Sequence, residues 1–190
     1  MKKILILDNY DSFTYNLFQI VDKIKPGRCE VFRNDKIQLS EVNNYHQIIL
    51  SPGPGIPSEA GIMPELVKEY ASKKSILGVC LGHQCIGEVF GAKLKNLDFP
   101  VHGKSSEITV TDGWDYLFKG LPQKITVGRY HSWIVEEENL PEELQVSAID
   151  MQGRIMALSH KKYDLKGVQF HPESIMTECG EQIIRNWLDH

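Results

Sequence analysis

The first half of the chain alternates short apolar runs with stretches in which apolar residues recur at helical spacing. The clearest apolar run lies at residues 4–7, and residues 29–32, 47–50 and 76–79 are also expected to form strands. A continuous apolar run without polar alternation is typical of a strand buried on both faces of a parallel sheet. The pattern therefore predicts successive strand and helix units, which favour an open sheet with helices on both faces.

The intervening stretches carry helix signals. Leu17, Val21 and Ile24 share one helical face behind Asp11 and Ser12, and either of these two side chains could accept a hydrogen bond from a helix start. Further helices are expected around residues 66–71 and 82–90, and an amphipathic helix around residues 183–188 closes the chain. Helices and strands thus alternate through the first ninety or so residues.

The second half changes to short β-like runs divided by turn residues. These runs lie at residues 108–111, 125–129, 145–149, 155–159 and 167–170. Several of them should pair antiparallel. The fold class expected for the whole is α/β, with an open, mostly parallel central sheet, helices on both faces and short antiparallel strands in the C-terminal half. The length of 190 residues predicts a single domain, 1–190.

Composition narrows the functional classes. Lys and Arg number 21 against 25 Asp and Glu, a net charge of −4 that argues against a nucleic-acid-coating chain. Asp8 follows only four apolar residues, too few for a signal-peptide core, and no stretch approaches the about 18 apolar residues of a membrane span. Four cysteines in a chain of this size suit reduced thiols rather than disulfide staples. We expect a cytoplasmic protein with no membrane partner.

Cys80 is the leading candidate nucleophile. It lies in 78–82 (Gly-Val-Cys-Leu-Gly), where a strand is expected to run directly into a helix, with glycine two residues to either side. A nucleophile on such a sharp turn needs small neighbours, because a Cβ on either flank would crowd the backbone. Amides at the start of the helix also favour a thiolate. The alternative interpretation is a buried structural cysteine, which is common for this residue type.

A thiolate nucleophile usually works with an imidazole and a group that orients it. His171 is the best candidate among the seven histidines, because it follows an expected strand and Glu173 lies two residues further on. Pro172 stiffens the link between them. By itself, His-Pro-Glu would also suit a solvated turn, so its significance depends on Cys80.

A second unusual loop, 51–55 (Ser-Pro-Gly-Pro-Gly), lets main-chain amides approach a ligand closely. Together with the amide of Leu81, one of its amides could stabilise an oxyanion. The alternative is a tight connection and nothing more. A phosphate-binding loop fits less well, because no Gly-Lys-Ser/Thr follows it.

Other clusters are weaker. Cys80, His83 and Cys85 lie close together, but structural zinc normally takes four ligands in pairs, so no metal site is predicted. Cys29 and Cys179 are expected to be packed thiols. The stretch 129–132 (Arg-Tyr-His-Ser) could line a pocket or form a strand end with a solvated arginine.

Taken together, these residues resemble the class I (triad) glutamine amidotransferases, in the right order over essentially the whole chain. The stretches that carry this resemblance are 50–55 (Leu-Ser-Pro-Gly-Pro-Gly), 78–84 (Gly-Val-Cys-Leu-Gly-His-Gln) and 169–174 (Gln-Phe-His-Pro-Glu-Ser). More particular stretches are similar to one branch, the small subunits of anthranilate synthase and aminodeoxychorismate synthase. These are 8–17 (Asp-Asn-Tyr-Asp-Ser-Phe-Thr-Tyr-Asn-Leu), 102–104 (His-Gly-Lys) and 129–132.

The resemblance implies roles for individual residues. Cys80 would be the nucleophile, His171 the general base and acid, and Glu173 the residue that orients the imidazole. Amides of the 51–55 loop and of Leu81 would form the oxyanion hole, and no cofactor is implied. The residues implied to contact the substrate are Gly53, Pro54, Gly55, Leu81, Gln84, Ser132 and Trp133. Trp133 departs from the pattern, since family members often carry a smaller apolar residue there.

The implied activity is hydrolysis of L-glutamine to glutamate through a cysteine thioester, with ammonia passed to a separate chorismate-binding synthase subunit. The product would be anthranilate or 4-amino-4-deoxychorismate, and the sequence leaves tryptophan and folate biosynthesis both open. Two alternatives remain. One is a free-standing cysteine hydrolase of similar fold, such as a γ-glutamyl hydrolase or a peptidase. The other is a non-catalytic, flavodoxin-like module that binds a small ligand.

Overall fold

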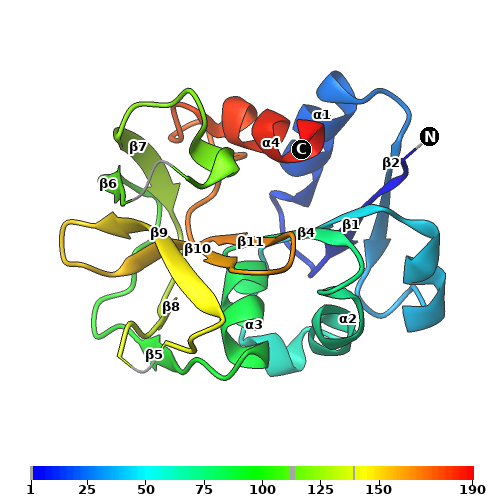
Figure 1. Ribbon diagram of the computed structural model, residues 1–190, viewed down its shortest axis with the longest axis horizontal. Coiled ribbons are helices and arrows are strands. Elements are labelled where there is room, and N and C mark those ends of the chain that lie inside the picture. The colour runs from blue at the N-terminus through cyan, green and yellow to red at the C-terminus, as the bar shows by residue number, and fades with distance from the viewer. Residues whose placement is uncertain (1, 112–113, 139) are drawn as a thin grey trace.

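The computed structural model describes residues 2–111, 114–138 and 140–190, and within these ranges nine strands form one mixed sheet (Figure 1). Its strand order is β2-β1-β3-β4-β11-β10-β9-β6-β7. The strands of this sheet are β1 (Ile4–Asp8), β2 (Cys29–Arg33), β3 (Gln47–Leu50), β4 (Ser75–Val79), β6 (Lys104–Val110), β7 (Lys124–Arg129), β9 (Leu144–Asp150), β10 (Ile155–His160) and β11 (Leu165–Val168). β5 (Leu94–Asn96) and β8 (Trp133–Val135) pair antiparallel apart from this sheet.

The half of the sheet built from the N-terminal segments is parallel. β2, β1, β3 and β4 pair in this way, and β1, β3 and nearly all of β4 are buried. β1, β3 and β4 are thus covered on both faces, as predicted. β2 is the edge strand of the sheet and is partly exposed. The open α/β fold is confirmed.

Helices cover both faces of the sheet (Figure 1). α1 (Thr14–Ile24) and α4 (Gly180–Asp189) lie on one face, and α2 (Met63–Tyr70) and α3 (Leu81–Val89) on the other. Each face has its own cluster of buried side chains, with Trp187 of α4 in the first and Leu66 of α2 in the second. None of the helices in the described ranges is long and apolar enough to cross a membrane.

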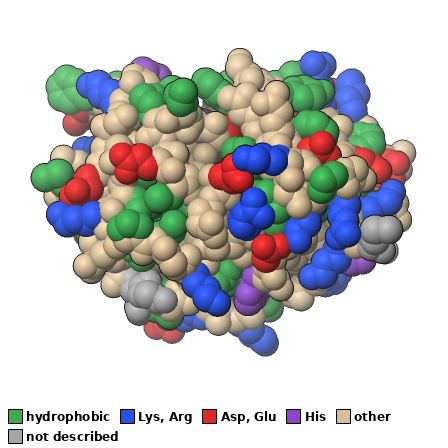
Figure 2. All heavy atoms as spheres, turned by 90° about the horizontal axis from the view of Figure 1, so that it is seen from above, with side chains coloured by type: hydrophobic (Ala, Val, Ile, Leu, Met, Phe, Trp, Pro, Cys, Tyr) green, Lys and Arg blue, Asp and Glu red, His purple; other side chains and the backbone are tan. Residues whose placement is uncertain are grey.

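The face over α1 and α4 carries acidic and basic side chains interspersed with hydrophobic ones (Figure 2). Lys23 of α1 pairs with Glu181 of α4 at 2.7 Å, and Lys25 pairs with Asp189 at 2.6 Å. Exposed pairs of this kind each contribute at most about 1 kcal/mol. The docking of α4 therefore depends mainly on its buried stripe, which includes Ile183, Ile184 and Trp187.

The C-terminal strands pair antiparallel, as predicted, and they extend the same sheet. β11 joins the two halves, because it pairs parallel with β4 on one side and antiparallel with β10 on the other. β9, β6 and β7 continue outward from β10. One sheet thus draws strands from both halves of the sequence. A single domain over 1–190 stays a prediction.

Local boundaries differ from the sequence expectations. α1 begins at Thr14, and Asp11 accepts a hydrogen bond from the Phe13 N–H at 2.7 Å, so it braces the turn before the helix. β11 ends at Val168, so Gln169 and Phe170 lie beyond the strand that the apolar run suggested. The short β5 and β8 and the 3₁₀ helices were not predicted, because such brief elements carry little periodic signal.

The sheet determines where the candidate residues meet. β4 and β11 are parallel neighbours in register, with Val79 opposite Val168. Cys80 follows β4 directly and His171 follows β11 by three residues. Both therefore emerge at the carboxyl edge of the strands, where ligands bind in open α/β sheets.

Candidate active site

Cys80 occupies the sharp turn that the sequence predicted between β4 and α3. Its φ of +52° and ψ of −96° are strained for a residue with a side chain. The flanking glycines are required by close backbone approach. A Cβ on Gly78 would lie 2.4 Å from the carbonyl carbon of Gly82, and one on Gly82 would lie 2.6 Å from the Leu50 carbonyl oxygen.

His171 and Glu173 form a buried pair, with 2.6 Å between Nδ1 of the imidazole and Oε1 of the carboxylate. The turn that holds them is tied to β7. The His171 N–H donates to the Gly128 carbonyl at 3.0 Å, and the Thr177 hydroxyl donates to the His171 carbonyl at 2.6 Å. The main chain of His171 is therefore held from two sides, and Glu173 orients the ring.

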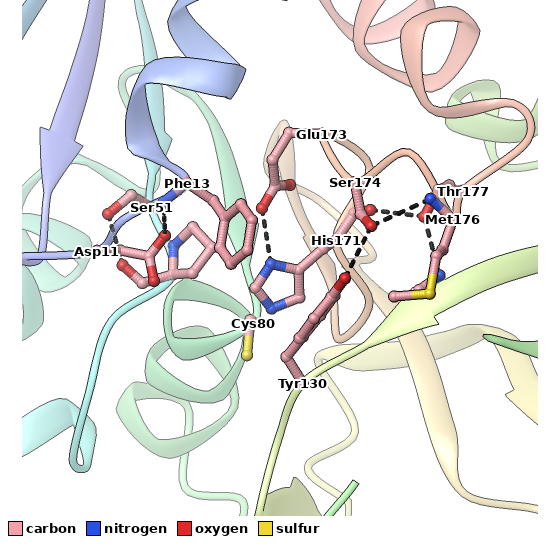
Figure 3. Close-up of polar contacts among 12 residues, drawn as sticks. Asp11, Phe13, Ser51, Cys80, Tyr130, His171, Glu173, Ser174, Met176 and Thr177 are labelled. Carbon is pink, nitrogen blue, oxygen red and sulfur yellow. Dashed lines mark hydrogen bonds and ion pairs between the residues drawn. The ribbon is translucent and has the colours of Figure 1, made fainter. Parts of the chain in front are cut away.

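The Cys80 side chain lies next to the His171 imidazole (Figure 3). The ring also makes edge contacts with Tyr130 and Phe13, at centroid distances of 4.9 and 6.1 Å. Its Nε2 has no hydrogen-bond partner among the described residues. Burial by itself lowers the pKa of His171, but the neighbouring Cys80 and Glu173 more than offset this and raise it to about 10. Such a ring can hold a proton beside a thiolate and pass it to a leaving group.

A pocket of about 260 Å³ opens at Cys80. Its walls bring together nearly all the predicted substrate-binding residues, from three separate segments of the chain. They are Gly53, Pro54, Gly55, Gln84, Ser132 and Trp133. Leu81 is buried and does not line the pocket, but it is the first residue of α3, so its main-chain N–H has no partner within the helix.

The 51–55 loop is held close to the end of β1. The N–H of Asn9 donates to the Ser51 hydroxyl at 2.8 Å, and its side-chain amide donates to the Ser51 carbonyl at 2.9 Å. A Cβ on Gly53 would lie 2.6 Å from the Asn9 carbonyl oxygen, so only glycine fits there. The glycine at 53 is therefore required by packing against the end of β1, and the approach of the loop amides to a ligand stays a prediction.

Three further residues line the pocket, namely His102, Tyr130 and His131. The sequence left 129–132 open as a pocket lining or a solvated strand end, and the structure places 130–132 at the pocket. His102 lies at the pocket because segment 97–101 is hydrogen-bonded to residues 131 and 132. The Val101 N–H, for example, donates to the His131 carbonyl at 3.0 Å. Its only signal in the sequence was the resemblance of 102–104 to one family branch.

The alternative of a solvated Arg129 at a strand end does not hold. Its guanidinium is buried and pairs with the buried Asp150 at 2.8 Å, and its Nε donates to Nε2 of His131 at 3.1 Å. Asp150 lies at the end of β9, a strand that no local pattern places near the end of β7. A buried charge needs such a partner, but the sequence cannot say which strand supplies it.

The remaining three cysteines do not line the pocket. Burial raises the pKa of Cys29 to about 12 and raises that of Cys85 further. Cys29 and Cys179 are half-buried and pack against the core, as expected. Within the described ranges, no group of three or more His, Cys, Asp or Glu side chains is arranged to hold a metal ion.

His83, which lies on α3 three residues after Cys80, should make the stability of the protein depend on pH. It is fully buried, and burial lowers its pKa to about 4, below its ordinary value of 6.5. Between pH 6.5 and about 4, His83 is therefore protonated in the unfolded chain but neutral in the folded chain. Stability should fall as the pH drops from 6.5 towards 4, by roughly 1.4 kcal/mol per pH unit for this one group.

Urea unfolding between pH 4.5 and 7.5 measures this effect. His83→Leu should flatten the dependence by about one proton. The matched control is His46→Leu at an exposed histidine, which should keep the wild-type slope. An unchanged slope in His83→Leu would show that His83 is not the group responsible.

The chain is similar to known proteins over nearly all of its length. The model for the family "Glutamine amidotransferase class-I" matches residues 5–190. The chain is 48% identical to anthranilate synthase component 2 of Cyanophora paradoxa, covering 98% of both chains. It is 45% identical to aminodeoxychorismate/anthranilate synthase component 2 of Bacillus subtilis, covering 98% of this chain and 95% of the relative.

Two further matches differ in kind. The chain is 46% identical over its whole length to the bifunctional protein TrpGD of Thermotoga maritima, but spans only 32% of that longer protein. A solved structure from Thermoplasma acidophilum, described as one of the subunits of a GMP synthase, matches with a TM-score of 0.88 at 27% identity, covering 100% of this chain and 93% of the other.

The fold and the site define an α/β protein that gathers a thiol, an imidazole and a carboxylate at the carboxyl edge of its sheet. With the family model and these relatives, the assignment is direct: the chain belongs to the class I glutamine amidotransferase family.

Proposed function

We propose that this chain hydrolyses L-glutamine with Cys80 as the nucleophile, His171 as the general base and acid, and Glu173 as the residue that orients His171. The observation that carries the proposal is the meeting of these three side chains, with the strained Cys80 opening into the pocket. A buried structural cysteine would need neither the strained turn nor the imidazole beside it.

The reaction follows from this placement. The Cys80 thiolate attacks the side-chain amide carbon of glutamine, and the C–S bond forms as the carbonyl electrons move onto oxygen. The proton on His171 passes to the amide nitrogen, the C–N bond breaks and ammonia leaves. Water, deprotonated by His171, then attacks the thioester carbon, and glutamate is released with regeneration of the thiol.

The oxyanion of both tetrahedral intermediates needs donors that are already in position. The N–H of Leu81 at the start of α3 is one, and an amide of the 51–55 loop is the other. Removing a single such donor costs about 2.7–4 kcal/mol in a well-studied hydrolase. The bracing of Ser51 by Asn9 supports the assignment, because a fixed loop loses little energy to reorganisation.

The pocket suits a small polar substrate. Gln84, Ser132 and Trp133 surround the space beside Cys80, and the volume of about 260 Å³ leaves room for one amino acid. We assign substrate contacts to these three residues and to Gly53, Pro54 and Gly55. The side chain of Trp133 is half-buried at this wall.

We further propose that the ammonia passes to a chorismate-binding synthase partner, which yields anthranilate, 4-amino-4-deoxychorismate or both. The support is the naming of full-length relatives as component 2 of both kinds of synthase. The hydrolysis is the same in each case, so the choice of acceptor belongs to the partner. We place the reaction in the cytoplasm, where the four free thiols would stay reduced.

Covalent labelling tests the nucleophile. A glutamine analogue with an electrophilic carbon in place of the amide should modify Cys80 and spare Cys29, Cys85 and Cys179, because only Cys80 lies in the pocket beside an imidazole. Peptide mapping by mass spectrometry gives the position, and excess glutamine should protect it. Modification of Cys85, or equal modification of all four thiols, would contradict the assignment.

A further inference from the structure

A chain of buried polar contacts joins the pocket wall to the Cys80 sulfur. The Nε2 of Gln84 lies 2.9 Å from the Trp133 carbonyl oxygen and 3.3 Å from Oε1 of Gln169. The Nε2 of Gln169 in turn lies 3.6 Å from the Cys80 sulfur. Both glutamines are buried, with exposed fractions of 3% for Gln84 and 0% for Gln169.

The Trp133 carbonyl determines the direction of every hydrogen bond in this series of contacts. A main-chain carbonyl only accepts, so Gln84 must turn its amide nitrogen towards Trp133. The same nitrogen meets Gln169, which must therefore present its oxygen. The nitrogen of Gln169 is then left facing the sulfur. Reversing either amide would bring two donors or two acceptors together in a buried place.

The Trp133 carbonyl is held from its other side as well. The Nδ1 of His131 lies 3.0 Å from it, while the Nε2 of His131 accepts from Arg129. Because arginine only donates, the His131 proton must be on Nδ1, where it points at Trp133. Burial and the Arg129 charge lower the pKa of His131 to about 3, so the ring stays neutral. The buried Arg129–Asp150 pair anchors the arrangement.

We propose that Gln169 is a further catalytic residue, whose side-chain N–H donates to the Cys80 sulfur and stabilises the thiolate. Gln84, fixed by the Trp133 carbonyl, is the positioning residue that keeps this N–H on the sulfur. The inference rests on the proposed function, since it takes Cys80 as the nucleophile. It gives Gln169 a part in forming the attacking species.

The rate of Cys80 alkylation by iodoacetamide, followed against pH by peptide mass spectrometry, tests this role, because that small reagent does not depend on the glutamine contacts. Hydrogen bonds to charged groups suggest that Gln169→Leu should slow Cys80 alkylation at pH 6 by about tenfold. The midpoint of the profile should move about one pH unit upward, while the plateau at high pH is retained, because there the thiolate forms without help.

Two other variants sharpen the result. Gln169→Glu keeps the shape and puts a carboxylate against the sulfur, so its profile should move further upward. Gln47→Leu is the matched control, since it removes a buried glutamine amide whose Nε2 contacts the Trp187 and Leu188 carbonyls at the opposite end of the sheet. It should keep the wild-type profile.

A wild-type profile in folded Gln169→Leu would overturn the proposal, and so would an equal loss of rate at every pH, which marks a merely structural role. Should Gln169→Leu fail to fold, Gln169→Glu decides in the same way. The proposed function fails separately, if the glutamine analogue does not modify Cys80 in the wild-type chain. Normal labelling with an unmoved Gln169 profile removes only the role of Gln169.

Discussion

Cys80→Ser is expected to abolish glutamine-dependent synthesis by the assembled complex while sparing synthesis from added ammonium salt. The serine hydroxyl occupies the same strained turn but is far less acidic than a thiol, so His171 cannot maintain it as an attacking anion. Loss of the nucleophile in triad hydrolases lowers turnover by about 10⁴–10⁶-fold. Ammonia supplied from solution bypasses this step, because in the proposed function the acceptor binds to the partner protein.

The measurement compares product formation from glutamine and from ammonium salt in the same preparation, with size-exclusion chromatography to show that the complex is assembled. Cys85→Ser is the matched control, since Cys85 lies on α3 five residues after Cys80 but is buried in the core. It should keep both activities. Loss of the ammonia-dependent reaction in an intact Cys80→Ser complex would contradict the proposed division of labour.

The parallel half of the sheet could be predicted because its strands carry their own signal. β1, β3 and β4 are continuous apolar runs, and each ends at a polar or glycine-rich turn. The sharp turn at Cys80 could also be predicted, because backbone contacts within 3 Å require glycine at positions 78 and 82. Local steric requirements of this kind leave a trace in the residue types themselves.

The order of the strands in the sheet could not be predicted from the sequence in the same way. Nothing local to Leu165–Val168 indicates that it inserts between β4 and β10, since its pairing with β4 joins segments far apart in the sequence. That insertion is what brings His171 to Cys80. The sequence paired the two residues on chemical grounds, because a thiolate nucleophile needs an imidazole, and the family resemblance implied the same pair. The structure shows the physical basis in the register of Val79 with Val168.

The polar surroundings of the site were hardest to foresee. Arg129 reads as a surface residue until Asp150 is placed beside it, and Gln169 reads as part of a strand until β11 is seen to end at Val168. Buried polar groups are satisfied by partners from anywhere in the chain, and residue type alone does not name the partner. A weak hint existed for Gln169, which lies two residues before His171.

His171→Ala is expected to reduce glutamine turnover nearly as far as Cys80→Ser, whereas Glu173→Gln should be milder. Removing the imidazole takes away both the group that accepts the thiol proton and the acid that protonates the departing nitrogen. The near-isosteric glutamine can still accept a hydrogen bond from Nδ1 across the 2.6 Å contact, so the ring stays oriented. What it loses is the charge, and with it part of the raised pKa of His171.

The two variants therefore separate orientation from charge. Steady-state ammonia release from glutamine should fall by about 10⁴-fold or more in His171→Ala, by comparison with the loss of the base in related triads. In Glu173→Gln the fall should be smaller, and the pH dependence of Cys80 alkylation should change as the pKa of His171 moves down from about 10. His46→Ala, at an exposed histidine, is the control and should retain full turnover. Equal losses in Glu173→Gln and His171→Ala would mean that the carboxylate charge, rather than the hydrogen bond it accepts, makes the imidazole competent.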